Sequence, residues 1–141
     1  MSHLSNRRKA RELALKALYM FDVQGEPDVK ALQCFWEGQP AKEEVRTRAE
    51  KMVRGVLDHV KELDRKIATA SKHWRIERMS RVDRNVLRLA AFEILHDPEV
   101  PEQVSIDEAV EIARRYGDNK SSAFINGILD HIWKEEKRDA P

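Results

Sequence analysis

The stretch that decides the fold is RVDRNVLRLAAFEIL, residues 81–95. At helical spacing its apolar side chains cover nearly the whole circumference, which is typical of a helix in the centre of a fold. Its only polar stripe consists of Arg81, Arg84, Asn85 and Arg88. Such a stripe must reach water, an internal acid or a partner. Glu93 falls among the apolar positions, so we expect an arginine or a backbone group to pair with it.

Segments of helical periodicity precede this stretch, and no alternation typical of β-strands competes with them. We expect helices over about residues 6–22 and 28–37, the first ending near Gly25 and the second beginning at Asp28 as N-cap and ending at Gly38. The apolar positions of residues 41–71 keep helical phase for too long for one globular helix. We therefore expect a break between Asp58 and Asp64, with Asp64 as the candidate cap of the second part.

Two more helices are predicted after the central stretch. Ser105-Ile106-Asp107-Glu108 has the pattern of a capping box, which predicts a helix start at Ser105. Gly117 is well placed to end this helix, and a last helix begins at Ser121 or Ser122. The sequence therefore predicts an all-α bundle of six or seven helices with short connections.

The length and composition fit one ordinary globular domain. The chain has 141 residues, 36% of them charged, and its 26 Lys+Arg against 25 Asp+Glu leave a formal net charge of +1. The only cysteine, Cys34, cannot form an internal disulfide bond, which suits the cytoplasm. We expect neither a membrane span nor a signal peptide, because no apolar run is long enough.

The residue types needed for catalysis form no constellation in the sequence. The five glycines are scattered and predict no phosphate-binding loop, and the five histidines show no metal-ligand spacing. Residues 97–111 contain six acids and no cation, but three of these acids fall where negative charge favours a helix start. We expect no enzyme activity, no cofactor and no metal site.

The positive charges are clustered, which favours a local site for a polyanion. Residues 1–11 hold four cations and no acid, and residues 72–88 hold six cations against two acids. We expect these clusters and the acidic run 97–111 to lie on opposite faces. In the first cluster, Arg8, Arg11 and Tyr19 fall on one helical stripe. Guanidinium groups bind phosphate and a tyrosine ring stacks on an unpaired base, so single-stranded RNA fits this stripe better than duplex DNA.

Three further features have a simpler explanation in packing. Trp74 and Trp133 stand near helix ends, and we expect both to pack in the core or at its rim rather than to stack on bases. Gly127, beside Asn126 in an apolar helix, predicts the close approach of a neighbouring helix. The basic N-terminus itself is open to a simpler interpretation, as a solvated segment without a ligand.

The chain resembles the NusB family of bacterial transcription antitermination factors in four blocks, which appear in the order of the family and together are specific. They are Arg7 to Glu12 with Ala17-Leu18-Tyr19, Val82 to Ala90 with Glu93, Val100-Pro101 with Val104 to Val110, and Ser122 to Asp130. The resemblance implies one all-α domain over residues 1–141, with helical subdomains over about 1–62 and 63–141. It also implies binding of boxA-type single-stranded RNA together with the small-subunit ribosomal protein NusE, in support of rRNA transcription by the RNA polymerase elongation complex.

The resemblance also implies the site residues. It assigns contacts with RNA to Arg7, Arg8, Arg11, Tyr19 and Phe124. It assigns Glu77, Asp83 and Arg84 to the surface that faces the ribosomal protein or the adjacent RNA. Lys120 departs from relatives that carry an acid there, so local RNA contacts are expected to differ. Some family members are homodimers, and no residue here decides that question.

Two other functions stay open at the level of sequence. One is a helical scaffold that binds a protein partner and has no RNA site of its own. The other is the N-terminal domain of an RNA methyltransferase, for which we expect no methyl transfer by this chain, because it has no nucleotide-binding glycine loop.

Overall fold

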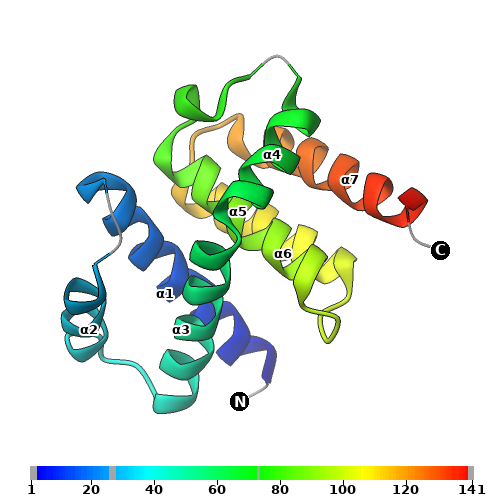
Figure 1. Ribbon diagram of the computed structural model, residues 1–141. Helices are drawn as coiled ribbons and strands as arrows, with labels where there is room; N and C mark the ends of the chain where they lie inside the picture. Colours follow the sequence, from blue (N-terminus) through cyan, green and yellow to red (C-terminus); the bar gives the residue numbers. More distant parts are fainter. Residues whose placement is uncertain (1–2, 26–27, 73, 140–141) are drawn as a thin grey trace.

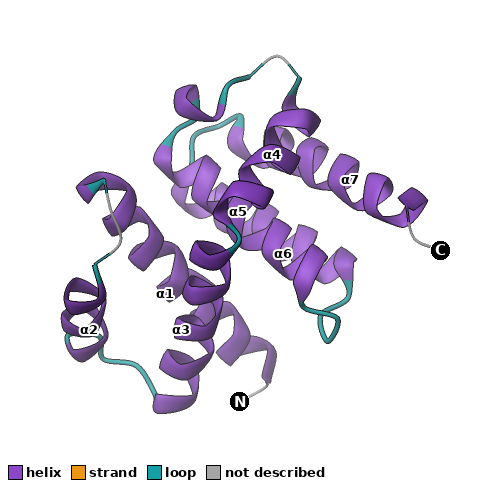
Figure 2. Cartoon of the chain, viewed as in Figure 1, coloured by secondary structure: helices purple, strands orange, loops and turns teal. Residues whose placement is uncertain are grey.

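The computed structural model describes residues 3–25, 28–72 and 74–139 (Figure 1). These residues form seven α-helices, one short 3-10 helix and no strand (Figure 2). The elements are α1 (His3–Gln24), α2 (Val29–Glu37), α3 (Glu43–Asp58), α4 (Val60–Ser71), η1 (Ile76–Arg78), α5 (Arg81–His96), α6 (Glu102–Tyr116) and α7 (Ser121–Asp139). The predicted all-α fold is confirmed. None of the helices in the described part of the chain has the length and hydrophobicity of a membrane span.

The central position predicted for residues 81–95 is confirmed. Helix α5 runs through the middle of the molecule and packs against α1, α3, α4, α6 and α7 (Figure 1). Its side chains Val86, Leu87 and Ala91 are buried in the single apolar core. A division into subdomains near residue 62 stays a prediction, and α5 packs against helices on both sides of that boundary.

A local capping signal places the start of α2, whereas the boundary between α3 and α4 has no side-chain cap. The Asp28 side chain accepts a hydrogen bond from the Lys30 backbone N–H and begins α2, and Gly38 ends it. The predicted break after α3 is confirmed, and His59 is the single residue between α3 and α4. The predicted cap at Asp64 is wrong, because this residue lies inside α4.

The predicted capping box at Ser105 is also wrong. Helix α6 begins at Glu102, directly after Pro101, whose backbone φ is −59°. Proline suits a helix start because its ring fixes φ near the helical value and its missing N–H costs nothing there. Ser105 is consequently buried inside α6, and its hydroxyl donates a hydrogen bond to Glu93 Oε1 at 3.2 Å.

The close helix approach expected at Gly127 occurs at another glycine. A Cβ added at Gly127 would meet no atom within 4 Å, and both Asn126 and Gly127 are exposed, so that expectation is wrong. In α3, by contrast, a Cβ at Gly55 would lie 2.2 Å from Phe92 Cζ of α5. The absent side chain at Gly55 is therefore what lets α3 lie against α5.

Candidate nucleic-acid interface

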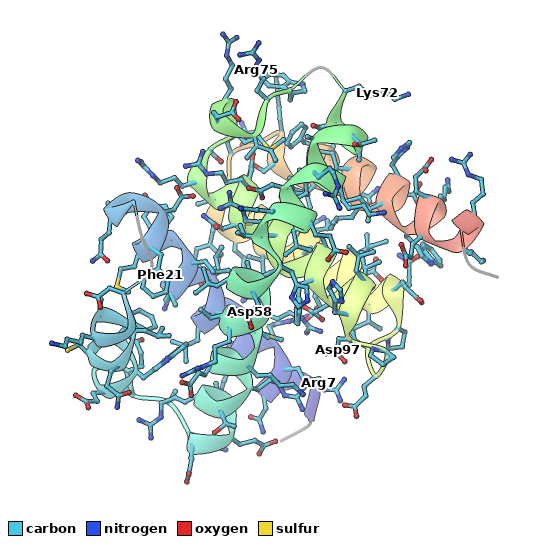
Figure 3. All side chains as sticks on the ribbon, viewed as in Figure 1. Arg7, Phe21, Asp58, Lys72, Arg75 and Asp97 are labelled. Atoms are coloured by element: carbon cyan, nitrogen blue, oxygen red, sulfur yellow. The ribbon has the colours of Figure 1, made fainter. Side chains whose placement is uncertain are left out.

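The solvent side of α1 carries the aromatic residue that the sequence singled out. Tyr19 is 42% exposed, and it lies seven residues, or about 10 Å along the helix, from Glu12 on the same stripe. Arg8 is one turn before Glu12. Arg7, labelled near the first turns of α1 in Figure 3, is half-buried, and its Nε has no hydrogen-bond partner among the described residues.

Arg8 is held in place by a glutamate of α6. Its Nε donates to Glu108 Oε1 at 3.0 Å and its Nη2 to Glu108 Oε2 at 2.7 Å. The hydrogen bond and the opposite charge raise the pKa of Arg8, and the same hydrogen bond lowers the pKa of Glu108 against the opposing effect of burial. The Arg8 side chain keeps 37% of its surface exposed, so it can still contact a ligand.

Arg11, one turn further, is buried. Its side chain is 3% exposed, and its guanidinium donates to Glu93 through Nε at 2.8 Å and through Nη2 at 2.7 Å. Burial acts to lower the pKa of Arg11, but the hydrogen bond and charge of Glu93 outweigh it and the pKa is raised. The expectation that an arginine or a backbone group pairs with Glu93 is confirmed, and the partner is Arg11. A side chain as buried as that of Arg11 cannot reach an RNA in this conformation. Its ion pair with Glu93 instead holds α1 against α5.

The end of α6 adds two side chains that the sequence did not single out. Arg115 Nη1 donates to Glu12 Oε1 at 3.0 Å, and the Tyr116 hydroxyl donates to Glu12 Oε2 at 3.0 Å. The Tyr116 ring is 43% exposed. We call this surface the α1–α6 face; it consists of Arg8, Glu12, Tyr19, Arg115 and Tyr116. The available signal was the run Arg114-Arg115-Tyr116 before the predicted helix end at Gly117.

Arg84, Asn85 and Arg88 of the polar stripe of α5 are paired inside the protein, whereas the Arg81 side chain is 49% exposed and approaches Asp22 only at 3.9 Å. Arg84 donates to both oxygens of Asp22 in α1, through Nε at 2.6 Å and Nη2 at 2.5 Å, and Asn85 donates to the same carboxylate at 2.8 Å. Arg88 binds Asp64 of α4 at 2.8 and 2.9 Å. Although burial acts to raise the pKa of Asp22, the hydrogen bonds from Arg84 and Asn85 lower it. Arg84 and Arg88 are therefore not free to bind a polyanion.

The expectation that acidic and basic clusters lie on opposite faces is wrong. Glu108, from the acidic run 97–111, binds Arg8 from the basic N-terminus. Among the cations of residues 72–88, the side chains of Lys72 and Arg75 project away from the body of the molecule (Figure 3). Neither forms an ion pair with another described residue. The free positive charge is thus smaller and more local than the sequence suggests.

Phe124 lies in the first turn of α7, next to an exposed tryptophan. The rings of Phe124 and Trp74 meet edge to face with centroids 5.9 Å apart. Trp74 is 57% exposed, so the expectation that it packs in the core or at its rim is wrong. Trp133, as expected, packs against the core. The aromatic pair is separate from the hydrogen-bonded residues on α1 and α6, although the end of α6 and the start of α7 lie at the same end of the molecule (Figure 1).

The three residues expected at the protein-partner surface differ in accessibility. Glu77, in η1, is exposed. Asp83 is buried, and its Oδ1 has no hydrogen-bond partner among the described residues. Arg84 is occupied by Asp22. Lys120 is exposed, and its backbone N–H donates to Asp118 Oδ1 at 2.8 Å.

Comparison with known proteins identifies the family. The NusB family matches residues 8–134 of the chain. The chain belongs to the NusB family. It is 48% identical over 129 residues to transcription antitermination protein NusB of Anaeromyxobacter dehalogenans (strain 2CP-1 / ATCC BAA-258), which covers 91% of this chain and 90% of that protein. The family resemblance expected from the four sequence blocks is therefore confirmed.

Solved NusB structures share the fold. T. maritima NusB matches with a TM-score of 0.83 and 36% identity, covering 95% of this chain and 97% of that one. A chain from the complex of the antitermination factors NusB and NusE with double-stranded RNA matches with a TM-score of 0.82 and 30% identity, covering 93% of this chain and 98% of that one. The residues that match the NusB family include the whole α1–α6 face together with Trp74 and Phe124.

Proposed function

We propose that this protein is a non-catalytic, cytoplasmic transcription antitermination factor that binds boxA-type single-stranded RNA together with the ribosomal protein NusE, supporting rRNA transcription. The observation that carries the proposal is the α1–α6 face, where two half-exposed tyrosines stand beside two partly exposed arginines. The named relative from Anaeromyxobacter supports the role in antitermination, and the solved complex of NusB and NusE with double-stranded RNA supports binding of RNA and of NusE.

The α1–α6 face suits unpaired RNA in a specific way. Tyr19 and Tyr116 can each stack on a base, a contact worth about 1–3 kcal/mol per base. Arg8 and Arg115 are already held by Glu108 and Glu12, so binding a phosphate through their remaining N–H groups would cost little further side-chain entropy. Because only a few phosphates are contacted, affinity depends moderately on salt, and base stacking supplies the preference for single strands.

The remaining residues divide between contact and support. Arg7 and Phe124 extend the RNA surface at its two ends, and Arg11 keeps α1 in place through Glu93. On the side of NusE, Glu77 is the exposed contact, and Arg84 holds η1 near α5 through the Ile76 carbonyl at 3.4 Å. Asp83 supports the start of α5, where its backbone N–H is capped by Ser80. NusE then links the RNA to the RNA polymerase elongation complex.

The test is binding of a fluorescent boxA-type RNA, measured by anisotropy with and without NusE. Tyr19→Ala removes one stacking ring and leaves every ion pair intact, so we expect affinity to fall about tenfold or more. Arg115→Ala should weaken binding and reduce its salt dependence. Arg54→Ala is the matched control, because Arg54 is likewise an exposed arginine paired with a glutamate, but on α3. Equal affinity of wild type and Tyr19→Ala would contradict the proposal.

A helical scaffold without an RNA site is the second candidate, favoured by the internal pairing of Arg8, Arg11, Arg84 and Arg88. In that case NusE binds this protein with unchanged affinity in the presence and absence of RNA. Binding is also measured with an RNA duplex of the same sequence, because equal affinity for the duplex and the single strand would contradict recognition by stacking. Sedimentation of the free protein in the same buffer shows whether a homodimer forms.

A further inference from the structure

Three potential metal ligands meet where α4 begins and α5 ends, away from the residues of the α1–α6 face. His59 separates α3 from α4, Glu62 lies in the first turn of α4, and His96 is the last residue of α5. One nitrogen of each histidine and one oxygen of Glu62 lie within 4.8 Å of one another. The sequence hides this group, because His96 is 34 positions from Glu62 and only the fold joins them.

The ring of His59 is oriented by the backbone. Its Nδ1 lies 2.8 Å from the Gly55 carbonyl oxygen. Since a carbonyl oxygen only accepts, Nδ1 carries the hydrogen and donates it, which leaves Nε2 as the ring nitrogen that can bind a metal ion. Histidine ligands of metal ions are held in this way, with one ring nitrogen bonded to a carbonyl and the other bonded to the metal. The glycine that admits Phe92 thus also supplies the acceptor.

The second histidine and the carboxylate already touch. His96 Nε2 lies 2.6 Å from Glu62 Oε1, so the two donor groups are in direct contact. The rings of His59 and His96 lie 4.1 Å apart and are tilted by 32°. Phe92 packs against both rings and covers one side of the group.

The group remains open to solvent on its other side. The side chains of His96 and Glu62 are 29% and 36% exposed. Asp58, Phe92 and both histidines line one shallow depression over α3, which gives an ion a route of entry. Asp58 and Asp97, the sequence neighbours of the two histidines, are labelled in Figure 3 and mark the two ends of the region.

We propose that His59, Glu62 and His96 form a site for a divalent transition-metal ion of the zinc class, with water as the fourth ligand. Two imidazole nitrogens and one carboxylate oxygen are a donor set typical of Zn²⁺, whereas Mg²⁺ and Ca²⁺ prefer oxygen ligands alone. Tetrahedral Zn²⁺ bonds of about 2.0–2.1 Å hold the donor atoms closer together than their present spread of up to 4.8 Å, so the side chains shift as the ion binds. The bound ion would fix the start of α4 to the end of α5.

The site is tested by titrating the full-length protein with Zn²⁺, followed by calorimetry and thermal unfolding, and with Co²⁺, followed by visible absorption. We expect one equivalent to bind, an intense tetrahedral Co²⁺ spectrum, a rise in Tm with Zn²⁺ and no effect of Mg²⁺. His96→Gln and Glu62→Gln should each weaken Zn²⁺ binding at least about tenfold. Two different ligands are replaced, so that a folding defect in one variant leaves the other informative.

The control variant is His131→Gln. His131 forms another histidine–glutamate pair, with Glu135 at 3.7 Å within α7, but the described residues place no second histidine beside it. Zn²⁺ binding unchanged in His131→Gln and weakened in His96→Gln supports the site. Binding that is lost in Cys34→Ser or His131→Gln, equal in wild type and His96→Gln, or no tighter for Zn²⁺ than for Mg²⁺, overturns it.

Discussion

Arg8 and Arg11 stand three residues apart on α1, and each binds a glutamate through two hydrogen bonds. Their surroundings differ, because Arg8 borders solvent and Arg11 lies in the core beneath it. A sequence shows the spacing of two arginines but not the depth of each one. The two arginines of this basic cluster therefore have different roles: Arg8 is available at the surface, and Arg11 stabilises the core.

This difference predicts unequal effects on stability. Arg11→Met leaves the carboxylate of Glu93 buried without its partner, so we expect a loss of about 3–5 kcal/mol in the free energy of unfolding. Arg8→Met removes a partner whose side chain is 37% exposed and leaves Glu108 beside Arg11 at 3.6 Å, so it should cost about 1 kcal/mol or less. Urea unfolding followed by circular dichroism measures both values. The double variant Arg11→Met with Glu93→Leu should recover much of the loss, and equal costs for the two single variants would refute the assignment.

At the scale of helices, two glycines with the same intrinsic helix propensity lie in opposite environments. Gly55 faces Phe92 across the α3–α5 contact, whereas Gly127 faces solvent on α7. Gly55→Ala should destabilise the protein by about 1–3 kcal/mol, because the new methyl group displaces the Phe92 ring. Gly127→Ala should stabilise it by about 0.5–1 kcal/mol through helix propensity alone.

Thermal unfolding of the two alanine variants measures the opposite signs. In the double variant Gly55→Ala with Phe92→Leu, the smaller leucine side chain should remove part of the clash with the new methyl group. The Tm of this double variant should therefore lie close to the Tm of Phe92→Leu alone. If Gly55→Ala were as stable as Gly127→Ala, the close approach of α3 and α5 would not be the reason for the glycine.

How far the sequence predicts the elements depends on whether the signal is local. The start of α2 depends on the neighbouring cap Asp28, which the sequence shows, and the break between α3 and α4 follows from the length of the apolar run, although the predicted cap at Asp64 is wrong. Ser105 had the pattern of a cap, but Pro101 offered an earlier start and the serine went inside. The tasks of Gly55 and of Arg115 depend on which helix lies opposite, and that is decided by tertiary packing.

The candidate site shows the same limit. The position of Tyr19 on an exposed helical stripe follows from a helical wheel. Its companion Tyr116 does not, because it lies near α1 only through Glu12, 104 residues away in sequence. The proposed metal site of His59, Glu62 and His96 cannot be predicted from the sequence for the same reason. Residue types indicate chemistry, and only the fold tells which of them meet.

For the whole molecule, the internal ion pairs predict how stability depends on pH. The pKa of Glu108 lies below its usual 4.5 and that of Asp22 below its usual 3.8, so each carboxyl binds a proton more readily in the unfolded chain. Acid therefore favours unfolding, and we expect stability to be complete at neutral pH and to fall below about pH 5 as the lowered pKa values are crossed.

Urea midpoints between neutral pH and about pH 3 measure this dependence. Glu108→Gln and Asp22→Asn should both lower stability at neutral pH and flatten its decline in acid, because the replaced side chains no longer titrate. Glu37, an exposed glutamate on α2, provides the control variant Glu37→Gln. A decline just as steep in both pair variants as in wild type would show that other groups control acid unfolding.

The same ion pairs bear on how the chain folds while it is being synthesised. The partners of Arg8, Arg11 and Asp22 follow them by 100, 82 and 62 residues. When α1 leaves the ribosome, neither Glu93 nor Glu108 has been made, and until α5 is made α3 is the main helix that packs against α1. The nascent N-terminal half therefore cannot complete its packing until α5 and α6 are made. During this interval its apolar surface is exposed, and binding by a chaperone would protect it from aggregation.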